Sequence, residues 1–314
     1  MKLKISEKLE PEEISLRKLF IQTSYVKGAW GRLADVHQER IRFGESTGLL
    51  LMGPSGAGKS ALASRYADAV NAERAVTQQC LPVVYLEMPS SPSKKNMCTA
   101  LLEALGDVDH AKRRNDSSEV KFLRAVTLIE NLKTELVIMD EAQHLIDYSR
   151  IDAYEAGDWI KSLMNKAGVS VVLVGMSRLE KLKKANSQFR RRFSATYTIK
   201  SFHPEEENWS EFLGVIKILQ KHMSVDAVDL LVPDMVQRLY FASNGLMDYL
   251  VKVLDRALVL VWEGAFPGIS LATLHQAFRE EVWLTAPSIR NPFDSSFNFL
   301  PLLGADEPFE EVDS

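Results

Sequence analysis

Eight consecutive residues of this chain have the types and the spacing of a phosphate-binding loop. They match the pattern G-x-x-x-x-G-K-S/T in full, in the order Gly53, Pro54, Ser55, Gly56, Ala57, Gly58, Lys59 and Ser60. Glycines let backbone N–H groups turn inward around a polyphosphate, the lysine ammonium can reach its β and γ oxygens, and the serine hydroxyl can hold Mg²⁺. Together with Ala61, which follows directly, the loop predicts a binding site for ATP or GTP.

The residues on either side give the loop the setting that this chemistry needs. The apolar run 49–52 follows Gly48 and is typical of a buried parallel strand, and 61–67 is typical of a helix. A strand before the loop and a helix after it direct the backbone amides at a bound phosphate. We therefore interpret the pattern as a site and not as a chance match.

Another apolar strand, 135–140, ends in Asp140 and is followed directly by a second acid, Glu141. Asp140 is expected to hold the Mg²⁺ that Ser60 also touches. Glu141 is expected to lie beyond the γ-phosphate, where a carboxylate can orient and deprotonate an attacking water. The alternative is that the acid pair only begins a helix, where the helix dipole favours it. Because a strand at 81–87 separates the loop from the acids along the chain, as in hydrolases with a glutamate after the metal-binding aspartate, we expect hydrolysis and not binding alone.

Further polar residues follow the acids and the next strand. Gln143 and His144 come directly after them; the histidine is expected either to make a structural hydrogen bond or to polarise water. Ser177 follows the apolar strand 169–175, and parallel sheets place their ligands at the carboxyl ends of strands. Ser177 is therefore a candidate sensor of the γ-phosphate or the water, with a turn serine as the alternative.

A basic block occupies 178–192, with seven basic residues and one acid. One arginine of 190–192 is expected to enter the nucleotide site of a neighbouring subunit and stabilise charge on the γ-phosphate. Arg192, directly before Phe193, is favoured, and Arg191 is the next candidate. The alternatives are a solvated surface and contacts with DNA phosphates.

Strand and helix signals alternate from 48 to about 200, which predicts an α/β fold with a parallel sheet covered by helices on both faces. The expected strands are 48–52, 81–87, 135–140, 169–175 and 195–200, and the expected helices between them are 59–71, 93–105, 118–132 and 155–167. From 204 the apolar spacing of three and four predicts helices at 205–221, 232–242, 246–262 and 271–282. The predicted divisions are a helical segment 1–47, a nucleotide-binding αβα core 48–203, a small helical lid 204–284 and an extended acidic tail 285–314.

Composition narrows the class of protein without identifying it. Of the 314 residues 46% are hydrophobic and 25% are charged, as in an ordinary globular protein. The net charge is −4, but 304–314 alone carries five acids and no base, so the overall charge says little about nucleic-acid binding. The stretch 285–314 is expected to be extended, and either packed over another surface or ordered by a partner. Its acidic end, which contains Phe309, is expected to dock on a basic partner or to stay solvated. No apolar run could cross a bilayer, the start has no secretion signal, and the two cysteines have no ligand spacing, so we expect a cytoplasmic protein without membrane contact.

Together these elements resemble the AAA+ ATPases, and in detail the transposon target-selection ATPases called TniB or TnsC. The resemblance covers about residues 20–260. It is carried by the phosphate loop, the acid strand with its continuation through 145, the segment 160–165, the strand 172–175 and the Arg-Phe pair at 192–193. The resemblance implies a phosphate-loop fold of the additional-strand glutamate type, and ATP with Mg²⁺ as its ligands.

The resemblance also implies an ATPase that oligomerises on double-stranded DNA as a ring or helical filament, hexamer- or heptamer-like. Such proteins link a target selector of the TniQ type to the transposase and its endonuclease, with ATP favouring assembly and hydrolysis favouring release. By position, the leading candidates for sequence-tolerant contacts with the DNA backbone are Lys94 and Lys95, followed by Lys112, Arg113 and Arg114. For both groups a solvated surface is the alternative.

One departure from the AAA+ pattern lies in the predicted lid. Many AAA+ proteins place a second sensor arginine after a glycine there, whereas the matching stretch 243–250 has Asp248 near that place and Arg256 two turns later. We therefore expect slow, switch-like hydrolysis. Two other classes share single motifs with the chain, namely ExeA-like ATPases of secretion or pilus assembly and replication initiators or helicase loaders. A neighbouring transposase gene would favour the transposon family over the secretion ATPases, and a replication initiator would be expected to carry a winged-helix DNA-binding module after the lid.

Overall fold

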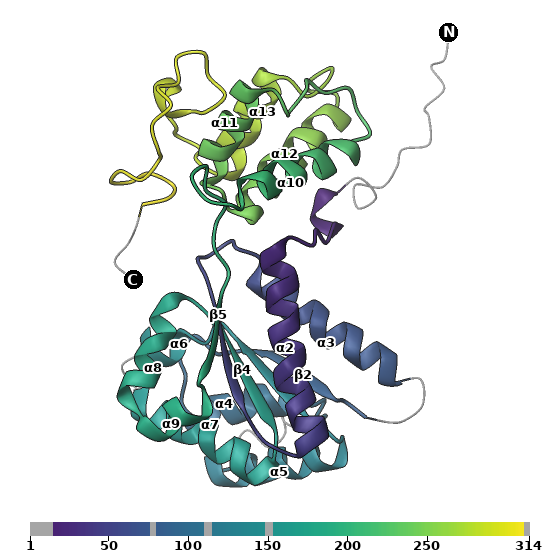
Figure 1. Ribbon diagram of the computed structural model, residues 1–314, viewed down its shortest axis with the longest axis vertical. Helices are drawn as coiled ribbons and strands as arrows, with labels where there is room; N and C mark the ends of the chain where they lie inside the picture. The colour runs from purple at the N-terminus through teal and green to yellow at the C-terminus, as the bar shows by residue number, and fades with distance from the viewer. Residues whose placement is uncertain (1–14, 76–79, 110–114, 148–152, 311–314) are drawn as a thin grey trace. The chain divides into compact units, whose positions relative to one another are not determined.

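The computed structural model describes residues 15–75, 80–109, 115–147 and 153–310, which divide between two compact units (Figure 1). The described residues between Tyr25 and Lys200 form a unit built around a sheet. Those of 1–24 and 201–314 form a helical unit.

Five parallel strands form the sheet, in the order β2-β3-β4-β1-β5. Their bounds are β1 (Gly48–Met52), β2 (Val83–Glu87), β3 (Leu136–Asp140), β4 (Ser170–Gly175) and β5 (Ala195–Thr198). The register sets Met52 of β1 opposite Gly175 of β4, and Met139 of β3 opposite Leu173 of β4. Because all pairs are parallel, the phosphate loop after β1 and the acids after β3 emerge at the same edge, with β4 between them.

Helices cover both faces of this sheet, and its three inner strands, β1, β3 and β4, are buried along their whole length. Figure 1 shows α2 (Ser24–Phe43) and α3 (Lys59–Ala75) on one face, and α4 (Lys94–Ala104), α5 (Ser118–Asn131) and α7 (Ala153–Ala167) on the other. Shorter helices follow β3 and β4, namely α6 (His144–Asp147), η2 (Ser177–Leu179), α8 (Glu180–Ala185) and α9 (Ser187–Arg192). These bounds confirm the predicted strands and helices to within a few residues. The fold is the predicted α/β parallel-sheet core accompanied by a helical region.

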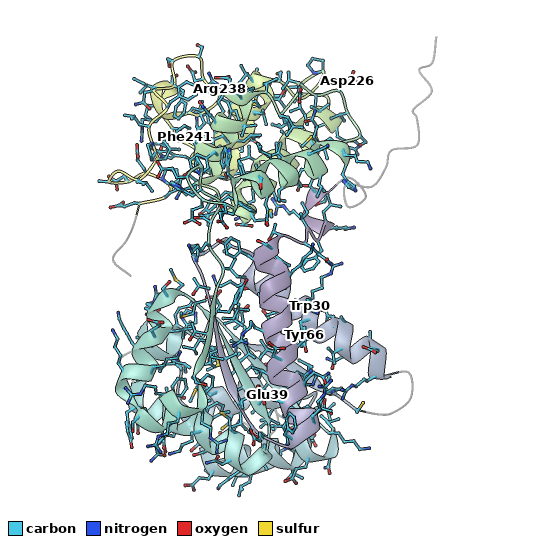
Figure 2. All side chains as sticks on the ribbon, viewed as in Figure 1. Trp30, Glu39, Tyr66, Asp226, Arg238 and Phe241 are labelled. Carbon is cyan, nitrogen blue, oxygen red and sulfur yellow. The ribbon has the colours of Figure 1, made fainter. Side chains whose placement is uncertain are left out.

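Helix α2 belongs to the sheet unit, in which it packs beside α3 and β5. Its Trp30 ring meets Tyr66 of α3 edge-on, with centroids 5.0 Å apart (Figure 2). At Gly28 a Cβ atom would lie 2.1 Å from the Tyr197 hydroxyl of β5, whereas at Gly31, one turn later, it would meet nothing within 4 Å. Helix α2 is therefore closely packed at Gly28 and has open space at Gly31. Its apolar positions were too sparse in the sequence to reveal which element they cover.

A polar cluster joins α2, α3 and the residue before β3. The carboxylate of Glu135 lies 2.8 Å from His37 Nε2 and accepts a 2.6 Å bond from Arg74, while His37 Nδ1 is 3.1 Å from the Tyr66 hydroxyl. Burial alone would raise the pKa of Glu135, but the hydrogen bonds from His37 and Arg74 outweigh it and lower the pKa. The cluster therefore depends on the ionised carboxylate.

The helical unit contains the four expected helices. They are α10 (Trp209–Lys221), α11 (Pro233–Ser243), α12 (Met247–Trp262) and α13 (Leu271–Glu281), accompanied by the short turns η1 (Leu16–Lys18) and η3 (Ser288–Arg290). Phe212, Leu254 and Phe278 are fully buried in its core. Burial of such side chains contributes roughly 1.5–3 kcal/mol each, and this gain opposes the conformational entropy that the unit loses on folding.

The C-terminal segment, described through 310, packs on the same helical unit, which is one of the two arrangements expected for 285–314. Phe309 is 8% exposed and its ring lies 5.0 Å from that of Tyr249. The guanidinium of Arg290 donates two 2.6 Å bonds to Glu307, so one of the tail's acids is neutralised internally. Arg238 of α11, labelled with Phe241 in Figure 2, donates to the carbonyl of Pro292 at 2.6 Å. Buried apolar side chains, together with the bonds from Arg238 and Arg290, thus hold this segment on the helical unit.

Candidate nucleotide-hydrolysis site

The phosphate loop occupies 53–60 between β1 and α3. Gly53 donates its N–H to Gly175 O at 3.2 Å, and a Cβ there would lie 2.5 Å from Ile199 O, so only glycine fits where the loop leaves the sheet. Gly56 and Gly58 have φ values of 76° and 83°, a region that side chains disfavour. Pro54 and Ser55 are exposed at the turn, Gly56 and Ala57 are half-buried, and Ser60 and Ala61 are exposed at the start of α3.

Lys59 lies beneath this loop and is 8% exposed. Its Nζ donates a 2.7 Å bond to Pro54 O, so the ammonium is satisfied by the loop itself. Burial lowers the pKa of Lys59, and the negative charges of Asp140 and Glu141 oppose that shift. The lysine therefore interacts electrostatically with both acids, although they follow a strand that is not a neighbour of β1.

Asp140 ends β3 and is 2% exposed. Its Oδ2 accepts a 2.6 Å bond from the Tyr85 hydroxyl of β2, and its Oδ1 accepts the N–H of Glu141 at 2.8 Å. Burial, followed by the hydrogen bond to Asp140, raises the pKa of Tyr85, so the hydroxyl remains a donor throughout the neutral range. Two donors thus fix the carboxylate plane of Asp140.

Glu141 begins the loop after β3 with a φ of 51°, in the left-handed region. Such a backbone conformation is uncommon for a residue with a side chain and is concentrated at functional sites. Gln143 donates from Nε2 to Oε2 of Glu141, and its own Oε1 accepts the N–H of Met176 at 3.3 Å. The carboxylate of Glu141 is half-buried and lies at the carboxyl edge, beside the residue expected to hold the metal.

The residues present fit Mg²⁺ by their donor chemistry. Mg²⁺ prefers oxygen ligands, keeps several waters, and is commonly bound through one or two carboxylates together with substrate phosphates. A carboxylate has about four lone-pair sites, and the hydrogen bonds from Tyr85 and Glu141 use two of those on Asp140. The exposed hydroxyl of Ser60 supplies a second protein oxygen.

Two further candidates lie near the carboxyl edge. Ser177 is exposed and begins η2, two residues after β4 ends at Gly175. His144 is half-buried and begins α6, and its N–H bonds to Glu141 O at 3.1 Å. The position of Ser177 suits a sensor, and the backbone of His144 supports the loop that carries Glu141.

The basic block does not form one uniform surface. Arg178 bonds to Asp147 at 2.6 Å, and Lys183 is hydrogen-bonded to Thr196 of β5. Arg192 is held within its own subunit, by Ser46 O at 2.9 Å and Asn165 Oδ1 at 2.6 Å. These three side chains are therefore already hydrogen-bonded within their own subunit.

Arg190 and Arg191, by contrast, are exposed on α9. Within the described residues neither guanidinium has a hydrogen-bond or ion-pair partner. The helix that presents them is fixed by Phe189 and Phe193, whose stacked rings have centroids 4.1 Å apart and are fully buried. Arg190 and Arg191 therefore extend into solvent from a short helix that Phe189 and Phe193 hold in place.

The structure places the first DNA candidates, Lys94 and Lys95, at the first two positions of α4. Both are exposed, and Lys94 makes a 3.4 Å ion pair with Glu155, an exposed contact of little energetic consequence. Because β2 is parallel to the other strands, the start of α4 lies at the same edge of the sheet as the phosphate loop. The second candidates, Lys112, Arg113 and Arg114, lie outside the described residues.

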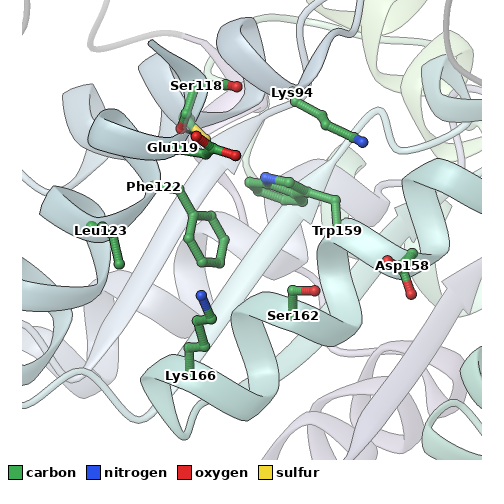
Figure 3. Close-up of a pocket in the computed structure, with 10 residues that line it drawn as sticks. Lys94, Ser118, Glu119, Phe122, Leu123, Asp158, Trp159, Ser162 and Lys166 are labelled. Carbon is green, nitrogen blue, oxygen red and sulfur yellow. Dashed lines mark hydrogen bonds between the residues drawn. The ribbon is translucent and has the colours of Figure 1, made fainter. Parts of the chain in front are cut away.

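Lys94 also borders a cavity of about 440 Å³ between α4, α5 and α7. Figure 3 shows Phe122 and Trp159 at this cavity, with Lys94 and Lys166 at opposite ends. The two rings meet edge-on with centroids 6.2 Å apart, and Lys166 Nζ lies 5.6 Å from the centre of the Phe122 ring. Glu119 and Asp158 also line the cavity, so its charge is mixed and does not by itself indicate a phosphate.

In the helical unit, Asp248 and Arg256 are engaged locally. Asp248 pairs with Lys252 at 2.7 Å along the same helix, and Arg256 pairs with Glu280 and, at 3.6 Å, with Glu263. These local ion pairs do not test whether the helical unit lacks a sensor arginine at the usual place, so that expectation stays a prediction.

Sequence reasoning missed Tyr85 and assigned Gln143 no role. Tyr85 sits in an ordinary apolar strand, and only the pairing of Glu87 with Asp140 brings it beside the aspartate. Gln143 carried a weak signal, since a polar residue two positions after Glu141 is close enough to bond its carboxylate. The bonds from Tyr85 to Asp140 and from Met176 to Gln143 do not follow from spacing, because each joins residues that lie on, or shortly after, different strands.

Comparisons with known proteins give a family and a fold. The protein-family model described as "TniB: Bacterial TniB protein" matches residues 15–202. A search of curated proteins found no match. Among the described residues no helix has the length and apolar character that crossing a membrane requires.

Three solved structures illustrate the fold. ORC2 of Aeropyrum pernix, in ADPNP-ADP complexes, is 14% identical with a TM-score of 0.64, over 88% of this chain and 73% of that chain. ORC1 of the same organism, in complex with DNA, is 16% identical with a TM-score of 0.66, over 86% and 69%. The RuvB Holliday junction branch migration motor of Thermotoga maritima is 14% identical with a TM-score of 0.50, over 85% and 72%. At these identities the likeness establishes the fold, which is that of AAA+ ATPases.

Proposed function

The chain belongs to the TniB family, and we propose that it is an ATP-hydrolysing, DNA-binding regulator of transposition. The observation that carries the proposal is the arrangement at the carboxyl edge of the sheet. A buried Lys59 under a complete phosphate loop interacts with Asp140 and Glu141 across the intervening strand. A triphosphate between loop and acids would meet a cation, a metal-binding carboxylate and a base, which is what hydrolysis requires. The choice of ATP over GTP rests on the family.

In the proposed reaction, water attacks the γ-phosphorus, the bond to the β-phosphate oxygen breaks, and ADP and phosphate leave. Lys59 binds the β and γ oxygens in place of Pro54 O. Ser60 and Asp140 would hold Mg²⁺, which when bound neutralises phosphate charge. Glu141 orients the water and accepts its proton, and Ser177 contacts the γ-phosphate or the water from the end of β4.

For the arginine supplied to a neighbouring subunit we propose Arg191 or Arg190 ahead of Arg192. Arg192 would have to give up its bonds to Ser46 O and Asn165 Oδ1 before reaching across a subunit boundary. The two exposed guanidiniums have no such partners to lose among the described residues. An arginine finger contributes about 10³–10⁵ in rate in related enzymes, so its loss should be conspicuous.

We further propose assembly on double-stranded DNA as a ring or filament of hexamer- or heptamer-like geometry, in the cytoplasm. Lys94 and Lys95 are proposed to contact the backbone, and the sequence at 112–114 provides a second basic group. Two lysines at the start of a helix oppose its dipole, so helix stability does not explain them. By family, the partners are a TniQ-type selector and the transposase with its endonuclease. ORC1, a neighbour in fold alone, was solved in complex with DNA.

The test is imaging of the purified protein with double-stranded DNA in ATP, ADP or a non-hydrolysable ATP analogue. Two variants run beside it. Lys59→Ala should lose nucleotide binding, whereas Glu141→Gln should bind ATP but not hydrolyse it, so its assemblies on DNA should persist. Phosphate release, measured in parallel, should be slow in the unchanged protein and absent from both variants.

Each outcome separates the classes of function. Rings or filaments on DNA that need triphosphate and disappear in Lys59→Ala support the proposal. Oligomers that form with ATP but ignore DNA would refute the DNA role and favour an ExeA-like secretion or pilus ATPase. Equal DNA affinity in every nucleotide state would refute the switch, since a ligand shifts an equilibrium only by its differential affinity for the two states.

A further inference from the structure

The side chain of Gln143 connects two parts of the sheet edge that belong to different strands. Gln143 is 5% exposed. Its Nε2 donates to Oε2 of Glu141, in the loop after β3, and its Oε1 accepts the N–H of Met176, directly after β4, at 3.3 Å. A single amide therefore bridges the proposed base and the end of the neighbouring strand.

The fold makes room for this bridge. A Cβ at Gly175 would lie 2.4 Å from Gln143 Oε1 and 2.9 Å from Leu179 Cδ1, so any larger residue there would displace the amide. The N–H of Ala142 also bonds to Val174 O at 2.9 Å, which ties the same loop to β4 through the backbone. The bridge is thus built into the packing of the loop and is not a chance contact at the surface.

The hydrogen-bond roles in this bridge allow one orientation. An ionised carboxylate only accepts, and a backbone N–H only donates. Turning the amide over would place its oxygen against Glu141 and its NH₂ group against the N–H of Met176, which loses both bonds. The remaining oxygen of Glu141, Oε1, has no hydrogen-bond partner within the described residues. One carboxylate oxygen is therefore held, and the other is left for water.

We propose that Gln143 is a positioning residue for hydrolysis, which fixes the carboxylate of Glu141 and links its orientation to the end of β4. The inference rests on the proposed function, in which Glu141 is the base. Any shift of 175–177 when a γ-phosphate binds would reach Glu141 through the amide. Because a base must lie within hydrogen-bond reach of the water it activates, small rotations of the carboxylate decide whether hydrolysis proceeds. Gln143 would in this way make hydrolysis depend on the state of the β4 end.

The test compares Gln143→Met with a matched control, Gln276→Met. Methionine has a similar length and lacks the amide donors and acceptor. Gln276 makes the same kind of bond, from Nε2 to Glu280 at 2.6 Å, on the exposed surface of α13 in the helical unit. We expect Gln143→Met to lower kcat for ATP hydrolysis about 10-fold or more, because an unaligned base forfeits part of the roughly 10²–10⁴ that general base catalysis supplies. Nucleotide affinity should stay within about twofold, and the control should keep its kcat.

A pH profile gives a readout that a structural role would not produce. In Gln143→Glu two carboxyl groups face each other, and such a pair retains a proton to a higher pH than either group alone. The protonated new side chain can donate to Glu141 as the amide does. We therefore expect kcat of this variant, relative to the unchanged protein, to recover as the pH falls from 8 toward 6.

The outcomes keep this inference apart from the proposed function. If Glu141→Gln hydrolyses ATP normally, the proposed role of Glu141 is wrong, and the inference about Gln143 falls with it. If Glu141→Gln is inactive while Gln143→Met keeps its kcat or exceeds it, Glu141 remains the base and Gln143 does not position it. A fall in kcat matched by an equal loss in Gln276→Met would also overturn the inference. Circular dichroism of each variant establishes that the compared proteins are folded.

Discussion

Tyr85→Phe removes one hydroxyl from the candidate site and leaves the ring in place, so no cavity forms. That hydroxyl donates to Asp140 at 2.6 Å, and because Asp140 is 2% exposed, water cannot readily replace the lost donor. A hydrogen bond to a charged group contributes roughly 1.5–3 kcal/mol, against about 0.5–1.5 kcal/mol between neutral groups. We therefore expect the substitution to lower the free energy of unfolding of the sheet unit by about 2 kcal/mol.

The charge on Asp140 is what makes this bond strong, which a double-mutant cycle can isolate. In an Asp140→Asn background the acceptor is neutral, and removal of the Tyr85 hydroxyl should then cost only about 0.5–1.5 kcal/mol. The expected coupling energy between the two positions is about 1 kcal/mol. Hydrogen exchange of the amides of β2 and β3, measured by mass spectrometry, reports on the sheet unit separately from the helical unit.

The raised pKa of Tyr85 adds a pH test to the same experiment. A tyrosine whose pKa is higher in the folded than in the unfolded protein stabilises the fold fully below the unfolded value of about 10, and less as the pH rises beyond it. The difference between Tyr85→Phe and the unchanged protein should therefore be constant from pH 7 to 9. Additive effects in the cycle, or no loss in the single variant, would refute the reasoning.

Three further predictions concern the sheet unit. Glu135→Gln should lower the free energy of unfolding by about 1–2 kcal/mol at pH 7, and the deficit should shrink below about pH 4.5, because the lowered pKa of this carboxyl stabilises the fold only while it is ionised. Gly31→Ala should stabilise α2 by about 0.5–1 kcal/mol, whereas Gly28→Ala should destabilise it by about 1–3 kcal/mol through its clash. Burial raises the pKa of Cys98 to about 11; at pH 8 about one in a thousand of its thiols is ionised, so maleimide should label Cys80 first.

These three predictions are checked by urea unfolding, by thermal melts and by mass spectrometry of labelled peptides respectively. A deficit in Glu135→Gln that does not change with pH would show that the ion pair does not carry it. Equal melting temperatures for the two glycine variants would remove the argument that the face of α2 toward β5 is closely packed. Labelling of Cys98 at the rate of Cys80 would mean that its thiol is not buried in solution.

Much of the fold, together with the phosphate loop and the two acids of the candidate site, can be predicted from local sequence. The strand 48–52, the loop after it and the acids after 136–140 are each recognisable within a few residues, because phosphate binding and strand burial both impose local patterns. The helix positions from 205 to 282 follow in the same way from their spacing. These elements differ from the expected bounds by a few residues at their ends.

What sequence could not supply is which segments lie beside each other. The hydrogen bond from Tyr85 to Asp140 joins residues that are 55 positions apart in the sequence. The close packing of Gly28 against Tyr197 likewise brings α2 next to β5. The acidic tail shows the same limit, since its sequence does not reveal which surface it packs on, whereas in the structure the Phe309 ring lies against Tyr249 of α12. Contacts of this kind depend on strand order and on packing, which leave no spacing to detect.

The place of β4 in the sheet has a consequence for how the two halves of the site keep their separation. Val171 is opposite both Gly48 of β1 and Val137 of β3, so one strand serves as the spacer between the phosphate loop and the acids. Neighbouring strands are about 4.8 Å apart, which sets that gap at roughly 10 Å whatever side chains line it. The main chain sets this distance between the loop and the acids. Substitutions in the loop or of the acids would therefore change reactivity without changing the distance. Substitutions of the buried valines of β4 would alter this distance only by displacing the strand itself.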